Sequence, residues 1–265
     1  MNTQPGWDHP DIARYFEEFC RRHARYRNAN RYLAGRARIG KNDRIIDFGA
    51  GTGRTAEAAL RHLGAQGAIL CVEPAQAMRA VGMERVRDPR VSWDTRIPAG
   101  SECWDRVLCG AAIWQLDPLQ EWFRRFARML KPAGALCFNI PSLYLGEAEQ
   151  PGGGKDPLLF FLPAILSEIR TSPPPQDGVA LRTAPQIDEM LRAAGLTPER
   201  WQVRTHLPYR AYKDWLKIPV NTEGLFAGLP ADARAALIED AFTRVDQQSW
   251  RWEKWTGWTA WKGNG

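Results

Sequence analysis

The sequence predicts an α/β protein whose core is a seven-stranded, mostly parallel sheet with helices on both faces. Three observations predict this. Short apolar strands alternate with amphipathic helices between residues 44 and 140, which is the pattern of a parallel sheet. A glycine-rich loop, residues 49–53, separates the first strand from the next helix. The length of 265 residues suits one such domain with an insertion.

The individual elements follow from apolar spacing and from turn residues. Apolar and aromatic residues at mixed three- and four-residue spacing predict one helix over residues 12–36. Glycine and proline mark the ends of most later elements. The predicted strands are residues 44–48, 68–72, 91–94, 104–109, 135–140, 199–206 and 254–261, and the further helices are residues 54–63, 75–81, 118–130, 184–194, 211–215 and 230–244.

The regular alternation breaks after Pro141. Residues 152–154 are three glycines and residues 173–175 are three prolines, and the apolar stretch between them, residues 158–169, is predicted to be helical. Long segments of this kind in compact domains act as lids or binding loops. We therefore expect an N-terminal helical cap (1–40), a core that binds the cofactor (41–141), an inserted lid (142–183) and a C-terminal part (184–265) that supplies strands six and seven.

Composition excludes several classes of protein. The net charge of +6 comes from arginines spread along the chain, so nucleic acid is not the expected partner. No run approaches the eighteen apolar residues of a membrane span, and the first ten residues lack a signal peptide; a cytoplasmic protein is expected. The five cysteines form no C-x-x-C pair, which predicts free thiols and no metal site.

The glycine loop indicates a nucleotide-like ligand. Gly49, Gly51 and Gly53 allow a ligand to approach the backbone closely, and the helix that follows presents free N–H groups. Glu73, directly after the second strand, can accept hydrogen bonds from both ribose hydroxyls. A dinucleotide fingerprint requires glycine where Arg54 stands, and no phosphate-loop lysine follows.

Five motifs in order then resemble the class I S-adenosylmethionine-dependent methyltransferases, and among them the small-molecule enzymes of the type 11 family. The resemblance covers about residues 40–140, with a weaker similarity at 184–196. Ala133 departs from the family's usual glycine. The motifs are residues 44–54 (RIIDFGAGTGR), 72–74 (VEP) with Met78, Asp94 with Ile97-Pro98, 104–108 (WDRVL) and 129–134 (MLKPAG).

This resemblance implies a Rossmann-like core and S-adenosyl-L-methionine as cofactor, with S-adenosyl-L-homocysteine as product. Asp47 would orient the methionyl amino group and Glu73 would hold the ribose. Pro74 and Met78 would flank the adenine, and Asp94 would accept from its N6. For Asp94 a plain loop acid, and for Met78 simple core packing, remain open alternatives. The expected cofactor-binding residues are Asp47, Gly49, Ala50, Gly51, Gly53, Glu73, Pro74, Met78, Asp94, Cys109 and Gly110.

The acceptor side is less well marked. Methyl transfer needs alignment and exclusion of water, and a general base only if the acceptor loses a proton. His206 is the candidate base, and a structural role for this histidine is the alternative. The C-terminal tryptophans, residues 250–261, either pack against the sheet or form an aromatic wall. The residues expected to line the acceptor site are Tyr15, Tyr26, Trp114, Tyr144 and Tyr209.

The expected function is methyl transfer to an oxygen, nitrogen or carbon atom of a small metabolite by a monomer or homodimer. Residues 109–112 (CGAA) lack the motif with which amino-group methyltransferases hold a flipped base. An RNA or protein methyltransferase with the same donor site, or a non-catalytic protein of the same fold, are the alternatives.

Overall fold

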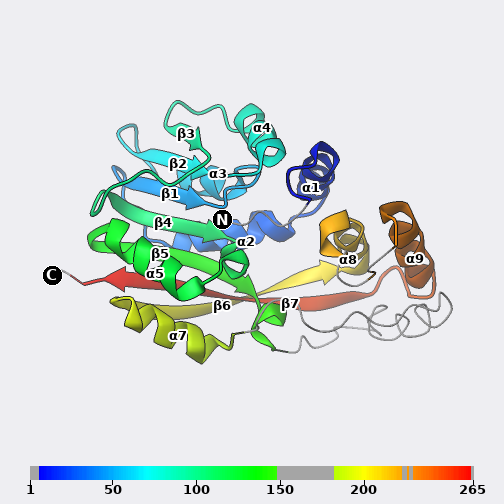
Figure 1. Ribbon diagram of the computed structural model, residues 1–265. Coiled ribbons are helices and arrows are strands. Elements are labelled where there is room, and N and C mark those ends of the chain that lie inside the picture. The colour runs from blue at the N-terminus through cyan, green and yellow to red at the C-terminus, as the bar shows by residue number, and fades with distance from the viewer. Residues whose placement is uncertain (1–5, 148–181, 223–225, 227–228, 264–265) are drawn as a thin grey trace.

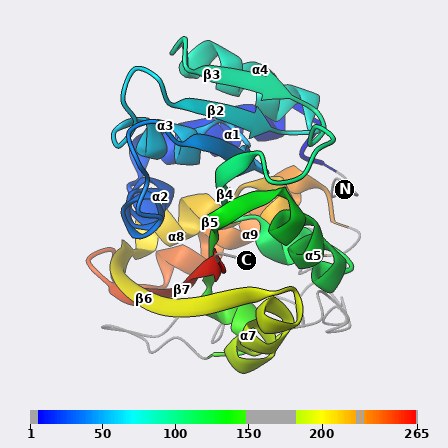
Figure 2. The ribbon, with the colours of Figure 1, turned by 90° about the vertical axis from the view of Figure 1, so that its left-hand side faces the viewer.

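The computed structural model describes residues 6–147, 182–222, 226 and 229–263. Seven strands form one sheet in the order β3-β2-β1-β4-β5-β7-β6 (Figures 1 and 2). All neighbours pair in parallel except β7, which is antiparallel to both β5 and β6. The predicted α/β class and its mostly parallel, Rossmann-like sheet are confirmed. The strands are β1 (Arg44–Phe48), β2 (Ala68–Val72), β3 (Val91–Asp94), β4 (Trp104–Gly110), β5 (Leu130–Pro141), β6 (Leu196–Pro208) and β7 (Trp250–Lys262).

Helices cover both faces of the sheet (Figure 2). On one face, α5 and α7 bury Phe123, Phe126 and Leu191 against β4, β5 and β7. On the other face, Leu33 of α2 and Ala56 of α3 pack over β1, β2 and β5. The α-helices of the described residues are α1 (Pro10–Arg22), α2 (Arg25–Arg36), α3 (Arg54–Leu60), α4 (Gln76–Arg85), α5 (Leu119–Met129), α7 (Ala184–Ala193), α8 (Tyr209–Leu216) and α9 (Ala231–Thr243).

A second, smaller core lies beyond the carboxyl ends of the parallel strands, where α1, α8 and α9 gather (Figure 1). Phe19 of α1 and Trp215 of α8 meet Phe242 of α9 within it. The long strands β6 and β7 extend from the sheet toward this core. The fold therefore places helical structure over the edge of the sheet at which ligands bind in open α/β proteins.

Several predicted boundaries were wrong. Residues 12–36 form two helices because His23, the C-cap residue of α1, takes an extended conformation and breaks the helical path. Residues 254–261 are part of a longer strand, because all of β7 pairs with β6. Residues 131–134, between the predicted helix 118–130 and the predicted strand 135–140, lie inside the bounds of β5, where the pairing shifts and Ala133 has a φ of 60°.

The C-terminal tryptophans divide between packing and exposure. Trp258 is fully buried, stacks on Phe138 with centroids 5.0 Å apart and donates from Nε1 to Asp188 at 2.7 Å. Trp252, in contrast, is 43% exposed. Packing against the sheet thus accounts for the central part of β7. Most of the expected lid, residues 148–181, with its predicted helix at 158–169, lies outside the described residues.

Candidate cofactor and acceptor site

The glycine loop joins β1 to α3 at the carboxyl edge of the sheet. Gly49, Gly51 and Gly53 have φ angles of 67°, 55° and 77°, a region that side chains with a Cβ disfavour. A Cβ at Gly51 would lie 3.3 Å from the methyl group of Met78. The loop therefore packs closely against α4 on one side. Because its glycines have no side chains, a ligand can approach the loop backbone.

Asp47 is the last residue but one of β1 and is completely buried. Its Oδ2 accepts from the N–H of Ala56 in the first turn of α3 at 2.9 Å, a position where the helix dipole favours a carboxylate. Its Oδ1 has no partner within the described structure. Burial raises the pKa of Asp47 to about 7, although the Ala56 N–H lowers it; Glu73 adds to the rise.

Glu73 directly follows β2 and is nearly buried. Its Oε2 accepts from the N–H of Gly51 at 2.7 Å, and its Oε1 accepts from the N–H of Ala75 at 2.9 Å. Burial raises the pKa of Glu73, and these two N–H groups oppose the rise. A carboxylate has about four lone-pair positions, so two hydrogen bonds leave about two acceptor positions for a ligand.

Two further buried oxygens without partners lie around this loop. Thr52 Oγ1 and Asn30 Oδ1 lack a hydrogen-bond partner within the described structure. Asn30 belongs to α2, and its Oδ1 lies 2.9 Å from the position of a Cβ on Gly110 at the end of β4. A side chain at Gly110 would overlap with Thr55. Together with the Asp47 carboxylate, these oxygens are unsatisfied acceptors beside the glycine loop. Buried polar groups rarely stay without a hydrogen bond to protein, ligand or water.

The expected adenine side is packed by α4. Met78 is buried with Ala75 and Ala13 in a small apolar cluster. Asp94, at the end of β3, is exposed, and its Oδ1 accepts from the N–H groups of Thr95 and Arg96 at 2.6 and 3.1 Å. These N–H groups hold the pKa of Asp94 below its ordinary value. The Asp94 carboxylate thus organises its own loop.

The N-terminal helix is fastened to the glycine loop by charged side chains that sequence reasoning missed. Glu17 of α1 pairs with Arg54 at the start of α3. Arg85 of α4 lies 3.9 Å from Glu17 and donates from Nε to the carbonyl of Thr52 at 2.9 Å. Asp8 Oδ1 accepts from the first N–H of α4, that of Gln76, at 2.8 Å. No local pattern in the sequence indicates these pairings.

Three of the five predicted acceptor-site aromatics lie in one region. Trp114, after β4, stacks on Tyr144, after β5, with centroids 4.8 Å apart and ring planes 14° apart. Tyr26 of α2 contacts Trp255 of β7 edge-on at 6.1 Å. The segment that carries Tyr144 begins beside Trp255, because Pro141 pairs with Trp255 in the sheet and Ser142 Oγ lies 3.4 Å from Thr256 Oγ1. We call Trp114, Tyr144, Tyr26 and Trp255 the aromatic cluster.

A buried ion pair, also missed from the sequence, supports this cluster. Arg25 donates from Nε to both carboxylate oxygens of Glu253, at 2.8 and 3.0 Å, and Nη2 contacts the same carboxylate. Glu253 accepts a further bond from Trp255 Nε1 at 2.9 Å. The Arg25 guanidinium lies 4.4 Å from the ring centroid of Trp215, and Trp215 Nε1 donates to the Tyr26 hydroxyl at 2.9 Å. This pair joins α2, α8 and β7.

The other predicted acceptor residues lie elsewhere. Tyr15 is 49% exposed on α1, and Tyr209 is buried against Phe242 in the second core. His206 is exposed on the edge strand β6 beside Trp250, four strands from β1, or about 19 Å at the usual strand spacing. The structure therefore does not bring His206 to the glycine loop. His23 is the histidine with an orienting carboxylate, since its Nε2 lies 2.7 Å from Asp214.

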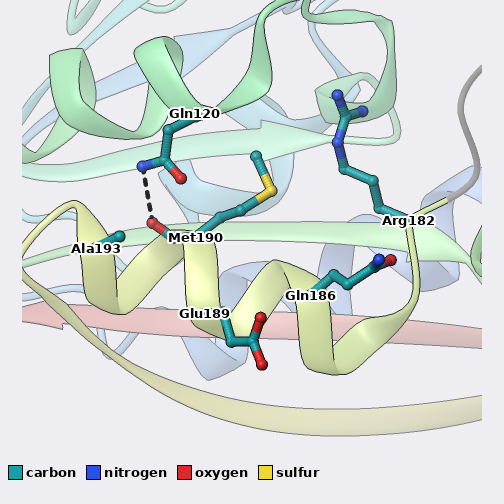
Figure 3. A pocket seen from close by; sticks show the side chains of 6 residues that line it. All are labelled: Gln120, Arg182, Gln186, Glu189, Met190 and Ala193. Atoms are coloured by element: carbon teal, nitrogen blue, oxygen red, sulfur yellow. Dashed lines mark hydrogen bonds between the residues drawn. The ribbon is translucent and has the colours of Figure 1, made fainter.

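A surface pocket of about 360 Å³ lies between α5 and α7, away from the glycine loop (Figure 3). Gln120 of α5 bridges the two helices by donating to the carbonyl of Met190 at 3.1 Å. The pocket has no part in the site described above. Its lining residues are Gln120, Arg182, Gln186, Glu189, Met190 and Ala193.

Comparison with known proteins agrees with this geometry. Residues 46–138 match the model of a family described as a methyltransferase domain. The chain is 27% identical over 111 residues to the ubiquinone/menaquinone biosynthesis C-methyltransferases of Bordetella parapertussis and Bordetella bronchiseptica, which covers 40% of this chain and 43% of each relative. The segment that the family model matches, residues 46–138, contains both Asp47 and Glu73. The chain contains a class I S-adenosylmethionine-dependent methyltransferase domain.

Solved structures extend the likeness of the fold over nearly the whole chain. The protein YcgJ from Bacillus subtilis superposes with a TM-score of 0.57 at 17% identity, over 92% of this chain and all of that one. A Haemonchus contortus phosphoethanolamine N-methyltransferase, solved with S-adenosylhomocysteine, gives 0.52 at 18% identity over 89% of this chain and 52% of that one. At these identities the likeness shows a shared fold. The chain thus spans about half or less of the length of several relatives.

The residues around the loop fit the cofactor S-adenosylmethionine that the domain implies. The unpaired oxygens of Asp47, Thr52 and Asn30 offer acceptors for its amino group, and the free lone pairs of Glu73 suit its ribose. Gly51 and Gly110 keep the chain clear where a Cβ would crowd the site. Cys109 is fully buried, and burial holds the pKa of its thiol well above the ordinary value, so that the thiol stays protonated.

Proposed function

We propose that this protein transfers a methyl group from S-adenosylmethionine to a small-molecule acceptor that binds against the aromatic cluster. The cofactor supplies an electrophilic methyl group when bound. Asp47 would hold its amino group, Glu73 its ribose, and Met78 with Pro74 its adenine. In the same proposal the cofactor also contacts Gly49, Ala50 and Gly53 of the glycine loop, and Asp94 accepts a hydrogen bond from the adenine N6.

The observation that supports this most is the position of α2. Asn30 lies beside Gly110 at the cofactor loop, and Tyr26 lies four residues earlier on the same helix, in the aromatic cluster. Four residues of helix span about 6 Å. One rigid element therefore holds the donor region and the aromatic cluster next to each other, which is the arrangement an in-line methyl transfer requires.

A small molecule is favoured over a macromolecule as acceptor. The aromatic cluster lies against α2, α8 and β7, and its flat rings suit a small aromatic or planar acceptor. The Bordetella relatives are named for C-methylation in quinone biosynthesis, which is consistent with an acceptor of metabolite size. No helix within the described ranges is long and apolar enough to cross a membrane.

Calorimetric titration with S-adenosylmethionine and S-adenosylhomocysteine tests the donor site. Absence of binding at high micromolar concentration would refute the cofactor assignment. Incubation with methyl-tritiated S-adenosylmethionine and three cell fractions, namely metabolites below about 3 kDa, total RNA and protein, then tests the acceptor class. We expect label in the metabolite fraction. Label confined to RNA or protein would replace this proposal with a macromolecular acceptor, and cofactor binding without transfer to any fraction would indicate a non-catalytic protein.

A further inference from the structure

Among the described residues, two hydrogen-bond donors at the aromatic cluster, on Arg25 and Tyr26, lack an acceptor. The side chain of Arg25 is 5% exposed, and its Nη1 has no partner within the described structure. Because Nε and Nη2 share the edge of the guanidinium that faces Glu253, Nη1 points away from that carboxylate. The Tyr26 hydroxyl accepts from Trp215, and its own proton has no acceptor among the described residues.

These groups remain donors at neutral pH. An arginine stays protonated throughout the physiological range, and the Glu253 carboxylate raises the pKa of Arg25 further although burial opposes this. Burial raises the pKa of Tyr26 to about 12. A ligand that satisfies both groups must therefore present an oxygen that accepts hydrogen bonds. A buried charged donor without an acceptor raises the free energy of the folded protein. A ligand oxygen that accepts from Arg25 Nη1 would remove this cost.

The positive charge of Arg25 is already balanced. Glu253 is 1% exposed at its side chain and neutralises Arg25, and the next residue, Lys254, pairs with Glu147. An anionic ligand would add an uncompensated charge to a region of low dielectric, which costs several kcal/mol. A cationic ligand would likewise add an uncompensated charge, and an ammonium group has no lone pair with which to accept from Arg25 Nη1 or the Tyr26 hydroxyl.

The other two residues of the aromatic cluster, Trp114 and Tyr144, form a flat stacked pair. Trp114 and Tyr144 are nearly parallel, and both are partly exposed. Parallel aromatic rings extend readily to a third planar group, and such stacking contributes about 0.5–1.5 kcal/mol beyond the area buried. The segment that carries Tyr144 lies beside β7 at Trp255, and the Arg25 guanidinium lies 5.7 Å from the ring centroid of Trp255, so the stack and Arg25 adjoin the same part of β7.

We propose that the methyl acceptor is a planar, uncharged molecule whose carbonyl or hydroxyl oxygen accepts hydrogen bonds from Arg25 Nη1 and the Tyr26 hydroxyl, with its ring against Trp114 and Tyr144. This inference rests on the proposed function, since it names the substrate class of the same site. In this proposal Arg25 and Tyr26 determine the specificity for the acceptor. Glu253 orients Arg25 and neutralises its charge.

Three probes of equal size and different charge test the proposal on the full chain saturated with S-adenosylhomocysteine. They are 2-acetonaphthone, which is neutral, 2-naphthoate, which is anionic, and 2-naphthylmethylammonium, which is cationic. Dissociation constants are measured by ligand-observed NMR. We expect 2-acetonaphthone to bind most tightly, by about tenfold or more over both ions, given the cost of burying an unpaired charge.

Substitutions then locate the binding. Arg25→Lys retains the ion pair with Glu253 but removes the second donor edge, and Tyr26→Phe removes only the hydroxyl. A lost hydrogen bond weakens affinity by about 2- to 12-fold for Tyr26→Phe and about tenfold or more for Arg25→Lys, because the latter donor is charged. Tyr32→Phe is the matched control: Tyr32 is also on α2, but its hydroxyl accepts from Arg36 on the outer surface, so we expect no change.

The outcomes separate the two proposals. If S-adenosylhomocysteine does not bind, the proposed function itself fails. If it binds but 2-naphthoate or the ammonium probe is preferred, if no probe binds, or if Tyr26→Phe leaves the affinity for 2-acetonaphthone unchanged, the inferred acceptor class is wrong. Should Arg25→Lys fail to fold, as judged by circular dichroism, Tyr26→Phe against Tyr32→Phe decides the question alone.

Discussion

Replacing Glu73 by glutamine is the most direct perturbation of the cofactor site. Both carboxylate oxygens already accept backbone N–H groups, Oε2 from Gly51 and Oε1 from Ala75. The substitution changes one of these oxygens into an N–H₂ donor, so one backbone N–H loses its acceptor. The same change removes an acceptor for one ribose hydroxyl. The variant therefore separates two effects, one on stability and one on cofactor affinity.

The magnitudes follow from these bonds. A hydrogen bond to a charged partner contributes about 1.5–3 kcal/mol, so we expect the dissociation constant of S-adenosylmethionine to rise about 10- to 150-fold. An unsatisfied buried N–H costs about 1–3 kcal/mol of unfolding free energy, but glutamine also avoids burying a charge whose pKa is raised. We therefore expect the melting temperature of Glu73→Gln to fall by less than about 10 °C.

Calorimetric titration at pH 8 measures the affinity, and thermal melting followed by circular dichroism measures the stability. Glu84→Gln is the matched control, because Glu84 is an exposed glutamate on the neighbouring helix α4; neither quantity should change. A folded Glu73→Gln variant that binds S-adenosylmethionine as tightly as the wild type would show that Glu73 does not hold the ribose, and the reasoning from its free lone pairs would be refuted.

Three other changes test separate parts of the structure. Because burial raises the Asp47 pKa from 3.8 to about 7, its proton must leave before it can pair with the cationic amino group, so the affinity for S-adenosylmethionine should rise with pH by up to about tenfold per unit below pH 7 and level off above it; calorimetry of Asp47→Asn should show a flat profile, and an equal slope would exclude Asp47 as its source. In the same window the unfolded chain has lost a proton that folded Asp47 keeps, so this group's contribution to stability falls as the pH rises from 4 to 7. Gly257→Ala should lower the unfolding free energy by about 1–3 kcal/mol in urea titrations, since a Cβ would overlap with the Trp201 ring, whereas Gly35→Ala, with open space, should not destabilise; equal effects would contradict the packing. Trp114→Ala should raise the Michaelis constant for the acceptor about 3- to 10-fold through lost stacking and leave cofactor affinity unchanged, and a loss of cofactor binding instead would show that Trp114 belongs to the donor site.

The cofactor side could be predicted from local patterns because its residues are neighbours in sequence. Asp47 and the glycines lie within seven positions, and a strand followed directly by a tight turn and a helix has few possible geometries. The place of Glu73 beside the glycine loop could be predicted because parallel strands end at one edge of the sheet; the register of β1 against β2 and the hydrogen bond from Gly51 to Glu73 agree with that place. The break between α1 and α2 was missed because apolar spacing continues across His23, while the backbone there turns to an extended conformation.

What the sequence by itself determined is therefore the class of fold, the order of strands and helices, and the glycine loop with its two acids. Only the tertiary structure decided which aromatic residues gather in the aromatic cluster, placing Trp114 against Tyr144 and Tyr26 against Trp255 while His206 lies on the outer edge. It alone revealed the Arg25–Glu253 pair, whose members are 228 positions apart. The physical reason is that motifs describe bonds and backbone turns between near neighbours, whereas burial and charge compensation depend on which distant surfaces pack against each other.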